Sequence, residues 1–280
     1  MKRPALLLAV ALLLASFVLI SYRILWLKYP VLPAAPAKVW QFSVDASIKG
    51  SEKEATVMIG LPSTQRGQLV VEERIHPGTL SFNLLREGSN QIGVWSGAIG
   101  PKGDLIGYSS TIQIQPQRLL RTGPPKLGPY PKNIGETEQK LAIRLVEKWG
   151  SLPPAERLRR IAAAVSGFWG TPPQSAQDLH AWSALRDTHG KMMASLVLLR
   201  AAGLPAQAVE GLPLAESVTG STVTWIETWT GQEWESLQPE KGEIYPKPLP
   251  LLPLTIGGLP AVRTVHGELS EVRWTLTREI

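Results

Sequence analysis

The hydrophobic pattern begins with an almost unbroken apolar run over residues 5–20, close to the amino terminus. Tyr22 and Trp26 follow this run, and aromatic residues of this kind gather where a membrane meets water. About 20 apolar residues are enough for a helix to cross the hydrocarbon core of a bilayer. We therefore expect residues 1–28 to form a transmembrane signal anchor.

The orientation of this anchor follows from its flanking charge. Lys2 and Arg3 precede the apolar run, and positively charged residues stay on the cytoplasmic side. The rest of the chain is then expected outside the cytoplasm. A cleaved signal peptide is the alternative interpretation, but the nearest Ala-x-Ala site, at residues 35–37, lies far beyond the run and contains a proline.

The pattern then changes to a period of two. Residues 29–38 are rich in proline and predict an extended spacer. From residue 39 to 117, apolar residues alternate with polar ones, as at Trp40, Phe42 and Val44, and turn-prone segments separate the alternating runs. Short alternating strands with frequent turns are typical of an antiparallel β-sandwich.

Helical periodicity replaces this alternation after a linker at residues 118–133. Apolar residues then recur at helical spacing in four segments, and shorter β-type runs follow. The expected helices lie at residues 136–149, 153–169, 174–186 and 191–202, and the expected strands at 206–209, 223–227, 234–237 and 272–276. The proline-rich stretch 246–260 predicts an irregular connection. Residues 134–280 are therefore expected to form an α+β domain.

Composition narrows the function classes. The chain has 280 residues, a mild net charge of +6 and 44% hydrophobic residues, which is a globular composition. It shows no run of Lys and Arg with interleaved aromatic residues, so nucleic acid is not an expected partner. It contains no Cys, which excludes disulfides, thiolate metal ligands and a thiol nucleophile. Its four His have no partners at metal-ligand spacing, so we expect neither a metal nor another cofactor.

Three phrases of the α+β domain carry a resemblance. They are Ser195–Ala206 (SLVLLRAAGLPA), Val223–Trp229 (VTWIETW) and Trp234–Pro239 (WESLQP). Together they resemble the core of the transglutaminase-like, papain-like superfamily. In that superfamily a Cys opens the helix of the first phrase, a His begins the strand of the second, and an Asp precedes the Pro of the third.

Aligned without gaps, these three catalytic positions fall on Thr188, Val223 and Gln238. A Thr hydroxyl needs an adjacent base, Val223 cannot act as one, and Gln238 then has no imidazole to orient. The resemblance therefore implies a degenerate triad and no enzyme activity. The competing hypothesis is a cryptic hydrolase or acyl transferase that uses Thr188 with the neighbouring His189, or a displaced Ser183.

The layout of the whole chain resembles, more specifically, a bacterial family: the inactive transglutaminase fused to seven transmembrane helices. Trp95 within Gly93–Ser96, residues 198–207 and residues 234–242 match recurring phrases of that family. The seven-helix part would follow the last strand, where this sequence has no second apolar span. We expect either a cut polypeptide or a separate gene for that part. The resemblance also suggests association with ATP-grasp, peptide-ligase-like enzymes.

These features lead to one hypothesis on function. The protein is expected in the bacterial inner membrane, with the bulk of the chain in the periplasm. There it is expected to bind a peptide-like ligand or a partner membrane protein, such as a seven-helix protein. It is not expected to catalyse a reaction. Ligand contacts are expected from His189, Trp225, Trp229 and Trp234. The alternative places Trp225 in the core, with the other two tryptophans partly covering the sheet. A purely structural spacer is the third hypothesis.

Overall fold

The computed structural model describes residues 38–50, 54–64, 68–114, 127–131, 134–167, 176–215, 217–231, 233–246 and 251–279, together with Ser16 and Tyr22. The chain divides into two compact units, residues 1–37 and 38–280. Apart from Ser16, Tyr22 and Lys38, the expected anchor and spacer lie outside the described residues. In the described part of the chain, no helix is long and apolar enough to cross a membrane. The anchor therefore stays a prediction from the sequence.

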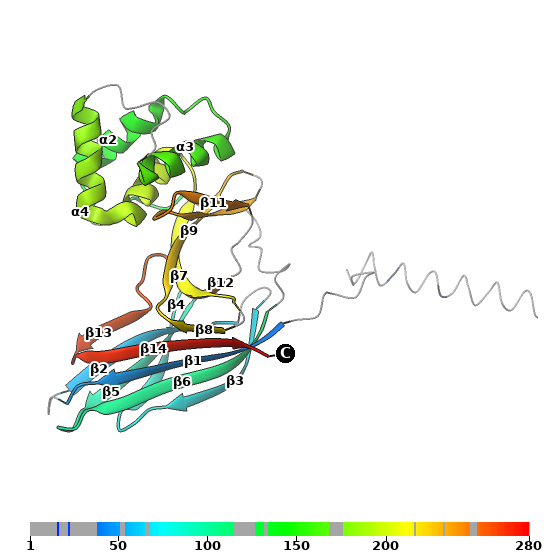
Figure 1. The fold of residues 1–280 in the computed structure, drawn as a ribbon, viewed down its shortest axis with the longest axis vertical. Coiled ribbons are helices and arrows are strands. Elements are labelled where there is room, and N and C mark those ends of the chain that lie inside the picture. The colour runs from blue at the N-terminus through cyan, green and yellow to red at the C-terminus, as the bar shows by residue number, and fades with distance from the viewer. Residues whose placement is uncertain are drawn as a thin grey trace, which may run out of the picture. The chain divides into compact units, whose positions relative to one another are not determined.

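A β-sandwich occupies the first part of the second unit (Figure 1). Its first six strands follow the period-two pattern and are β1 (Lys38–Ile48), β2 (Glu54–Leu61), β3 (Gln68–His76), β4 (Ser81–Glu87), β5 (Asn90–Ala98) and β6 (Asp104–Ile114). Every second side chain of β1 from Trp40 to Ile48 is buried, because successive side chains of a strand point to opposite faces of its sheet. The predicted antiparallel sandwich is therefore confirmed for these strands.

Three strands from the carboxyl-terminal half complete the sandwich: β8 (Ser217–Gly220), β13 (Val262–His266) and β14 (Leu269–Arg278). One sheet has the order β3-β6-β1-β14-β8 and the other β13-β2-β5-β4. The sequence pattern had placed all of 134–280 in the second domain, and the structure differs here. Alternation shows that a segment is a strand but not which strand it pairs with, so the return of β13 and β14 to the sandwich has no local signal.

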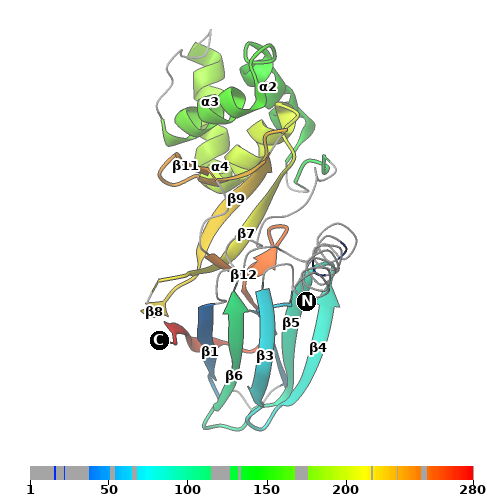
Figure 2. The same ribbon diagram turned by 90° about the vertical axis from the view of Figure 1, so that its right-hand side faces the viewer.

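The helices and a third sheet form the rest of the second unit (Figure 2). Its elements are α2 (Glu136–Glu147), α3 (Pro154–Ser166), α4 (Ala176–Ala201), β7 (Ala206–Pro213), β9 (Val223–Trp229), β10 (Trp234–Gln238), β11 (Glu243–Pro246) and β12 (Leu251–Ile256). The third sheet has the order β11-β10-β9-β7-β12. Ile226 and Leu237 bury one face of it against helix residues such as Leu158 and Leu198.

Two details differ from or refine the expected elements. α4 is interrupted at Gly190, whose φ of 77° and ψ of 162° are not helical, so it holds the two helical segments that the pattern predicts. The stretch 246–260 contains strand β12 rather than an irregular connection only. Pro253 is tolerated within this strand because β12 is an edge strand of the third sheet.

Strand β7 takes part in two hydrophobic cores. At its start, Ala206 packs against the core under the helices. At its end, Leu212 lies in the sandwich core together with Leu252 and Leu254 of β12. The third sheet and the sandwich therefore share buried side chains.

An irregularity in edge strand β3 builds a polar contact in the sandwich. Glu72 has a φ of 50°, the only positive φ of a non-glycine residue among those described, and the register with β6 shifts between Val71 and Glu73. Such a bulge re-aims a side chain. The Glu73 carboxylate accepts hydrogen bonds from Tyr108 Oη at 2.5 Å and from Gln91 Nε2 at 3.0 Å. Burial of Tyr108, reinforced by this hydrogen bond, raises the pKa of its phenol well above the ordinary value.

We expect the free energy of unfolding to fall with pH more steeply in the wild type than in Tyr108→Phe above about pH 10. In the unfolded chain the phenol ionises near its ordinary pKa of about 10, whereas in the folded chain it stays neutral. A raised folded pKa stabilises below the unfolded pKa, and this contribution is lost as pH rises toward the folded value. The free energy of unfolding is measured by urea unfolding at several pH values. Plotted against pH, it should fall more steeply in the wild type than in Tyr108→Phe, by about 1.4 kcal/mol per pH unit. Parallel curves for the two proteins would contradict the burial of a neutral phenol.

Candidate functional site

Two of the three degenerate triad positions lie at one end of the third sheet. Val223 is the first residue of β9 and Gln238 the last of β10. The two strands are antiparallel neighbours, with Leu237 opposite Ile226. Since Leu237 and Ile226 face the helices, Gln238 and Val223 lie on the opposite face of the sheet. Both side chains are partly buried.

The third position lies in α4, close to the break of this helix. The side chains of Thr188 and His189 lie outside the described residues, but the backbone of both is helical and Gly190 follows directly. A new helical segment begins after Gly190. Its Lys191 donates from Nζ to the backbone oxygen of Glu240 at 3.0 Å and approaches the Glu240 carboxylate at 3.8 Å. The break in α4 is thus tied to the turn that follows Gln238.

Of the side chains at these two sheet positions, only Gln238 offers hydrogen bonds, and neither is a base. Val223 is a hydrocarbon, and the carboxamide oxygen of Gln238 lies 3.4 Å from the hydroxyl of Tyr245. The same hydroxyl donates to the carboxylate of Glu243. This hydrogen bond raises the pKa of Tyr245 above its ordinary value, so its phenol is neutral near neutral pH. The group formed by Gln238, Glu243 and Tyr245 is therefore suited to binding polar atoms.

The three tryptophans named as ligand contacts share this face of the sheet but differ in exposure. Trp225 is only 3% exposed and packs with Val209 and Leu251, which matches the core alternative. Trp234 is 6% exposed, and its ring meets that of Trp229 edge-on, with centroids 5.9 Å apart. Trp229 is partly exposed, so it is the tryptophan best placed to contact a ligand.

A polar row across the third sheet had no place among the expected site residues. Cross-strand pairing places Gln207 opposite Glu227, Glu227 opposite Ser236, and Ser236 opposite Tyr245. Gln207 Nε2 donates to Glu227 Oε2 at 2.9 Å. The sequence signal for this row was Glu227 itself, a carboxylate between two tryptophans at period-two spacing. The row could not be completed from the sequence because it depends on the register of four strands.

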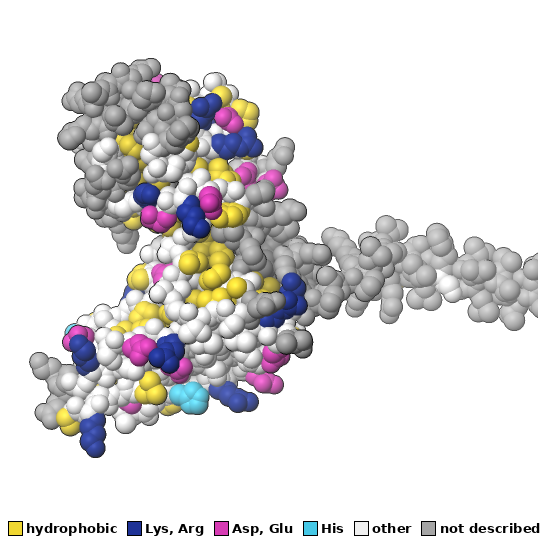
Figure 3. All heavy atoms as spheres, in the orientation of Figure 1, with side chains coloured by type: hydrophobic (Ala, Val, Ile, Leu, Met, Phe, Trp, Pro, Cys, Tyr) yellow, Lys and Arg dark blue, Asp and Glu magenta, His cyan; other side chains and the backbone are white. Residues whose placement is uncertain are grey.

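The local charge around this row is acidic, in contrast to the whole chain. Residues 223–246 contain five glutamates and one lysine, whereas the whole chain carries a net charge of +6. Figure 3 shows acidic and basic side chains interspersed over the described part of the face that it presents. Among the described residues, no group of three or more His, Cys, Asp and Glu could hold a metal ion.

Comparison with known proteins identifies the fold. No protein-family model and no curated protein matches this chain. A solved structure named "a putative cysteine protease from Cytophaga hutchinsonii" is similar, with a TM-score of 0.55 and 11% sequence identity, over 87% of this chain and 91% of that chain. This likeness supports an α+β, transglutaminase-like fold for the chain, and at this identity it shows the fold alone.

Proposed function

We propose that this protein is a membrane-anchored, periplasmic, non-catalytic transglutaminase-like protein that binds a peptide-like ligand or a partner membrane protein. The observation that carries the proposal is that the chain contains no Cys, although its fold is similar to that of a protein named a cysteine protease. The inner-membrane anchor rests on the apolar run over residues 5–20.

The chemistry of the sheet positions supports the absence of catalysis. A papain-like reaction needs a thiolate, an imidazole that takes its proton, and a group that orients the imidazole. Val223 offers neither a proton acceptor nor a hydrogen bond through its side chain. Gln238 is neutral, and its carboxamide oxygen lies 3.4 Å from the hydroxyl of Tyr245.

The polar row supports binding. Gln207, Glu227, Gln238 and Tyr245 are partly buried side chains that carry hydrogen-bonding groups on one face of the third sheet. Trp229, partly exposed beside them, adds an apolar surface. Small numbers of placed polar groups next to aromatic side chains are typical of ligand sites, and amides with carboxylates match the donors and acceptors of a peptide backbone.

Two assays test the proposal. In the first, the full chain in detergent is incubated with a pool of short synthetic peptides, and hydrolysis or acyl transfer is followed by mass spectrometry. We expect no turnover above buffer. Turnover that Thr188→Ala or His189→Ala abolishes would establish the cryptic hydrolase or acyl transferase instead.

In the second assay, binding of the same peptides, and co-purification of membrane proteins with the full chain, are compared between variants. We expect Glu227→Gln to weaken binding by about tenfold, since a hydrogen bond to a charged group contributes about 1.4 kcal/mol or more. We expect a similar loss in Trp229→Ala, since it removes an aromatic contact surface. Glu235→Gln is the matched control, because Glu235 lies on the neighbouring strand but on the opposite face. Equal binding by all variants would contradict this face of the sheet as the binding site, and no binding by any of them would favour the structural spacer.

A further inference from the structure

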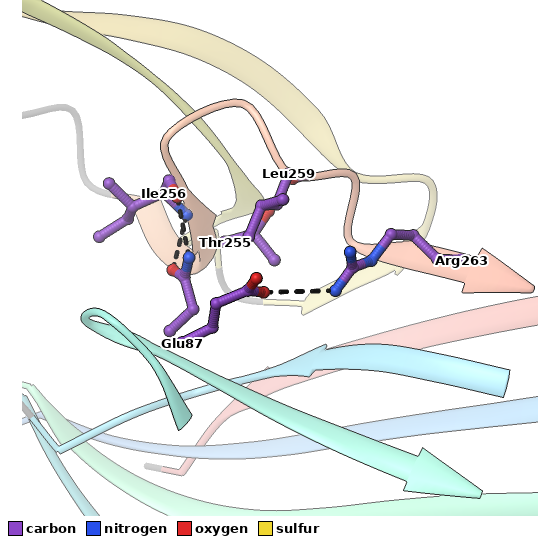
Figure 4. A network of polar contacts seen from close by, with 6 residues as sticks. Glu87, Thr255, Ile256, Leu259 and Arg263 are labelled. Carbon is purple, nitrogen blue, oxygen red and sulfur yellow. Dashed lines mark hydrogen bonds and ion pairs between the residues drawn. The ribbon is translucent and has the colours of Figure 1, made fainter. Parts of the chain in front are cut away.

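One side chain of the sandwich, that of Asn90, forms hydrogen bonds with the free backbone edge of β12, as a neighbouring strand would. Asn90 is 7% exposed and begins β5. Its Nδ2 donates to the backbone oxygen of Ile256 at 2.8 Å, and its Oδ1 accepts from the backbone nitrogen of Ile256 at 2.8 Å (Figure 4). Both backbone groups on the free edge of β12 at this residue are therefore satisfied by a single carboxamide.

The surroundings of this pair bind β12 to the sandwich. β12 lies against β2 and β5. Leu252 and Leu254 are buried in the sandwich core. Gly60 of β2 passes so close that a Cβ atom there would lie 2.5 Å from Thr255 Cγ2. The ion pair of Arg263 Nη2 with Glu87 Oε2, at 3.5 Å, is partly exposed (Figure 4) and contributes little by comparison.

The contact continues across the third sheet to the candidate site. Ile256 is opposite Val209, and Val209 is opposite Trp225. Because Ile226 is opposite Leu237, the next residue of β10, Gln238, lies beside Trp225. One cross-strand row therefore leads from Asn90 of the sandwich to Gln238.

We infer that Asn90 is a positioning residue that fixes the third sheet to the sandwich, so that both behave as one body and the row from Ile256 to Gln238 keeps its place. This inference goes beyond the proposed function and does not require that the site binds a ligand. It requires that loss of the carboxamide frees the Ile256 end of β12 and that the change reaches Trp225.

The test compares Asn90→Ala, Asn90→Asp and Asn83→Ala in the full chain. Asn83 lies in the same hairpin but is exposed, so its variant is the control. Hydrogen exchange measures the Ile256 amide. The fluorine NMR signal of Trp225, in fluorotryptophan-labelled protein and assigned through Trp225→Phe, reports on the cross-strand row from Ile256 to Gln238. In Asn90→Ala we expect exchange at Ile256 to be about tenfold faster or more, since buried backbone groups lose their partners, and a shifted or broadened Trp225 signal.

Asn90→Asp gives a readout that a loss of packing would not give. A protonated carboxyl donates and accepts like the carboxamide, so both hydrogen bonds can form, whereas a carboxylate has no donor for the Ile256 oxygen. The native contact is expected below the ordinary Asp pKa of about 3.9 and is lost as pH rises through the raised folded value. The charged groups around this hairpin and β12 include Glu87, Arg86, Glu73, Arg263 and Glu210. These groups are present in all variants. Subtracting the pH dependence of Asn83→Ala from that of Asn90→Asp therefore cancels the contribution of their titration.

Two results would overturn the inference: exchange at Ile256 in Asn90→Ala no faster than in Asn83→Ala, or an Asn90→Asp protein whose exchange and Trp225 signal do not depend on pH relative to that control. If Asn90→Ala does not fold, the low-pH and neutral states of Asn90→Asp carry the test alone. Peptide binding is not measured, so failure here leaves the proposed function untouched.

Discussion

A chain that lacks residues 269–280 is expected to lose the cooperative unfolding transition of its β-sandwich, although these residues stand at the far end of the sequence from β1. β14 lies between β1 and β8 in its sheet, and it pairs with β1 from Trp40 to Ile48. Its removal would leave this edge of β1 without backbone partners in the middle of a sheet, and unpaired buried backbone groups are costly.

A single substitution in β14 should already destabilise the β-sandwich strongly. Trp274 and Leu276 are buried in the sandwich core, and the ring of Trp274 lies 6.0 Å from that of Phe42. Truncation of a buried Trp to Ala costs about 3–5 kcal/mol, against a total stability of about 5–15 kcal/mol for a domain. We expect Trp274→Ala to lower the free energy of urea unfolding by this amount.

Thr277→Ala serves as the control for Trp274→Ala, because Thr277 is an exposed residue of the same strand. Its unfolding midpoint should match that of the wild type. If the truncated chain unfolds with the wild-type midpoint and slope, β14 would not be part of the sandwich in solution.

Gly211→Ala is expected to destabilise the protein by about 3 kcal/mol, at the upper end of what overpacking costs. A Cβ atom at Gly211 would lie 2.0 Å from the backbone oxygen of Leu252 and 2.9 Å from its carbonyl carbon. These are backbone atoms of the paired strand, so no side-chain rotation relieves the overlap. β7 and β12 must separate instead, which opens the contact between the third sheet and the sandwich.

Chemical unfolding measures this effect, with Gly100→Ala as the control because a Cβ atom at Gly100 meets nothing within 4 Å. The control should unfold within about 0.5 kcal/mol of the wild type. A Gly211→Ala protein equally close to the wild type would show that β12 does not approach β7 in the way described.

The fold could be predicted from the sequence where the signal is local. The alternation at Trp40, Phe42 and Val44 predicted β1 because one face of the strand is buried. The helix that ends before Gly203 was likewise visible, since the φ of Gly203 is 71° and glycine favours this conformation at a helix end. In both cases the residues that determine the element are part of it.

The rest depends on contacts between distant residues. β14 has the alternation of a strand, but nothing in Trp274 or Leu276 tells that their neighbour is β1. β12 was hidden by Pro253 and the prolines that flank the strand. The carboxamide of Asn90 that satisfies Ile256 stands more than a hundred residues before it in the sequence. The candidate site shows the same division: Val223 and Gln238 came from sequence phrases, whereas Gln207 and Tyr245 joined the site only through strand register.

The pairing of β1 with β14 has a consequence for the order of events during synthesis. Residues 38–48 leave the ribosome long before their partner strand, residues 269–278. Domains usually fold as soon as they are made, from the amino terminus onward, but this sandwich cannot close until β14 has been made. Until then the open edge of β1 is available to other strands, which is a hazard for aggregation. Contacts between such distant residues also slow folding. The newly made chain is thus expected to depend on chaperones until β14 has been made.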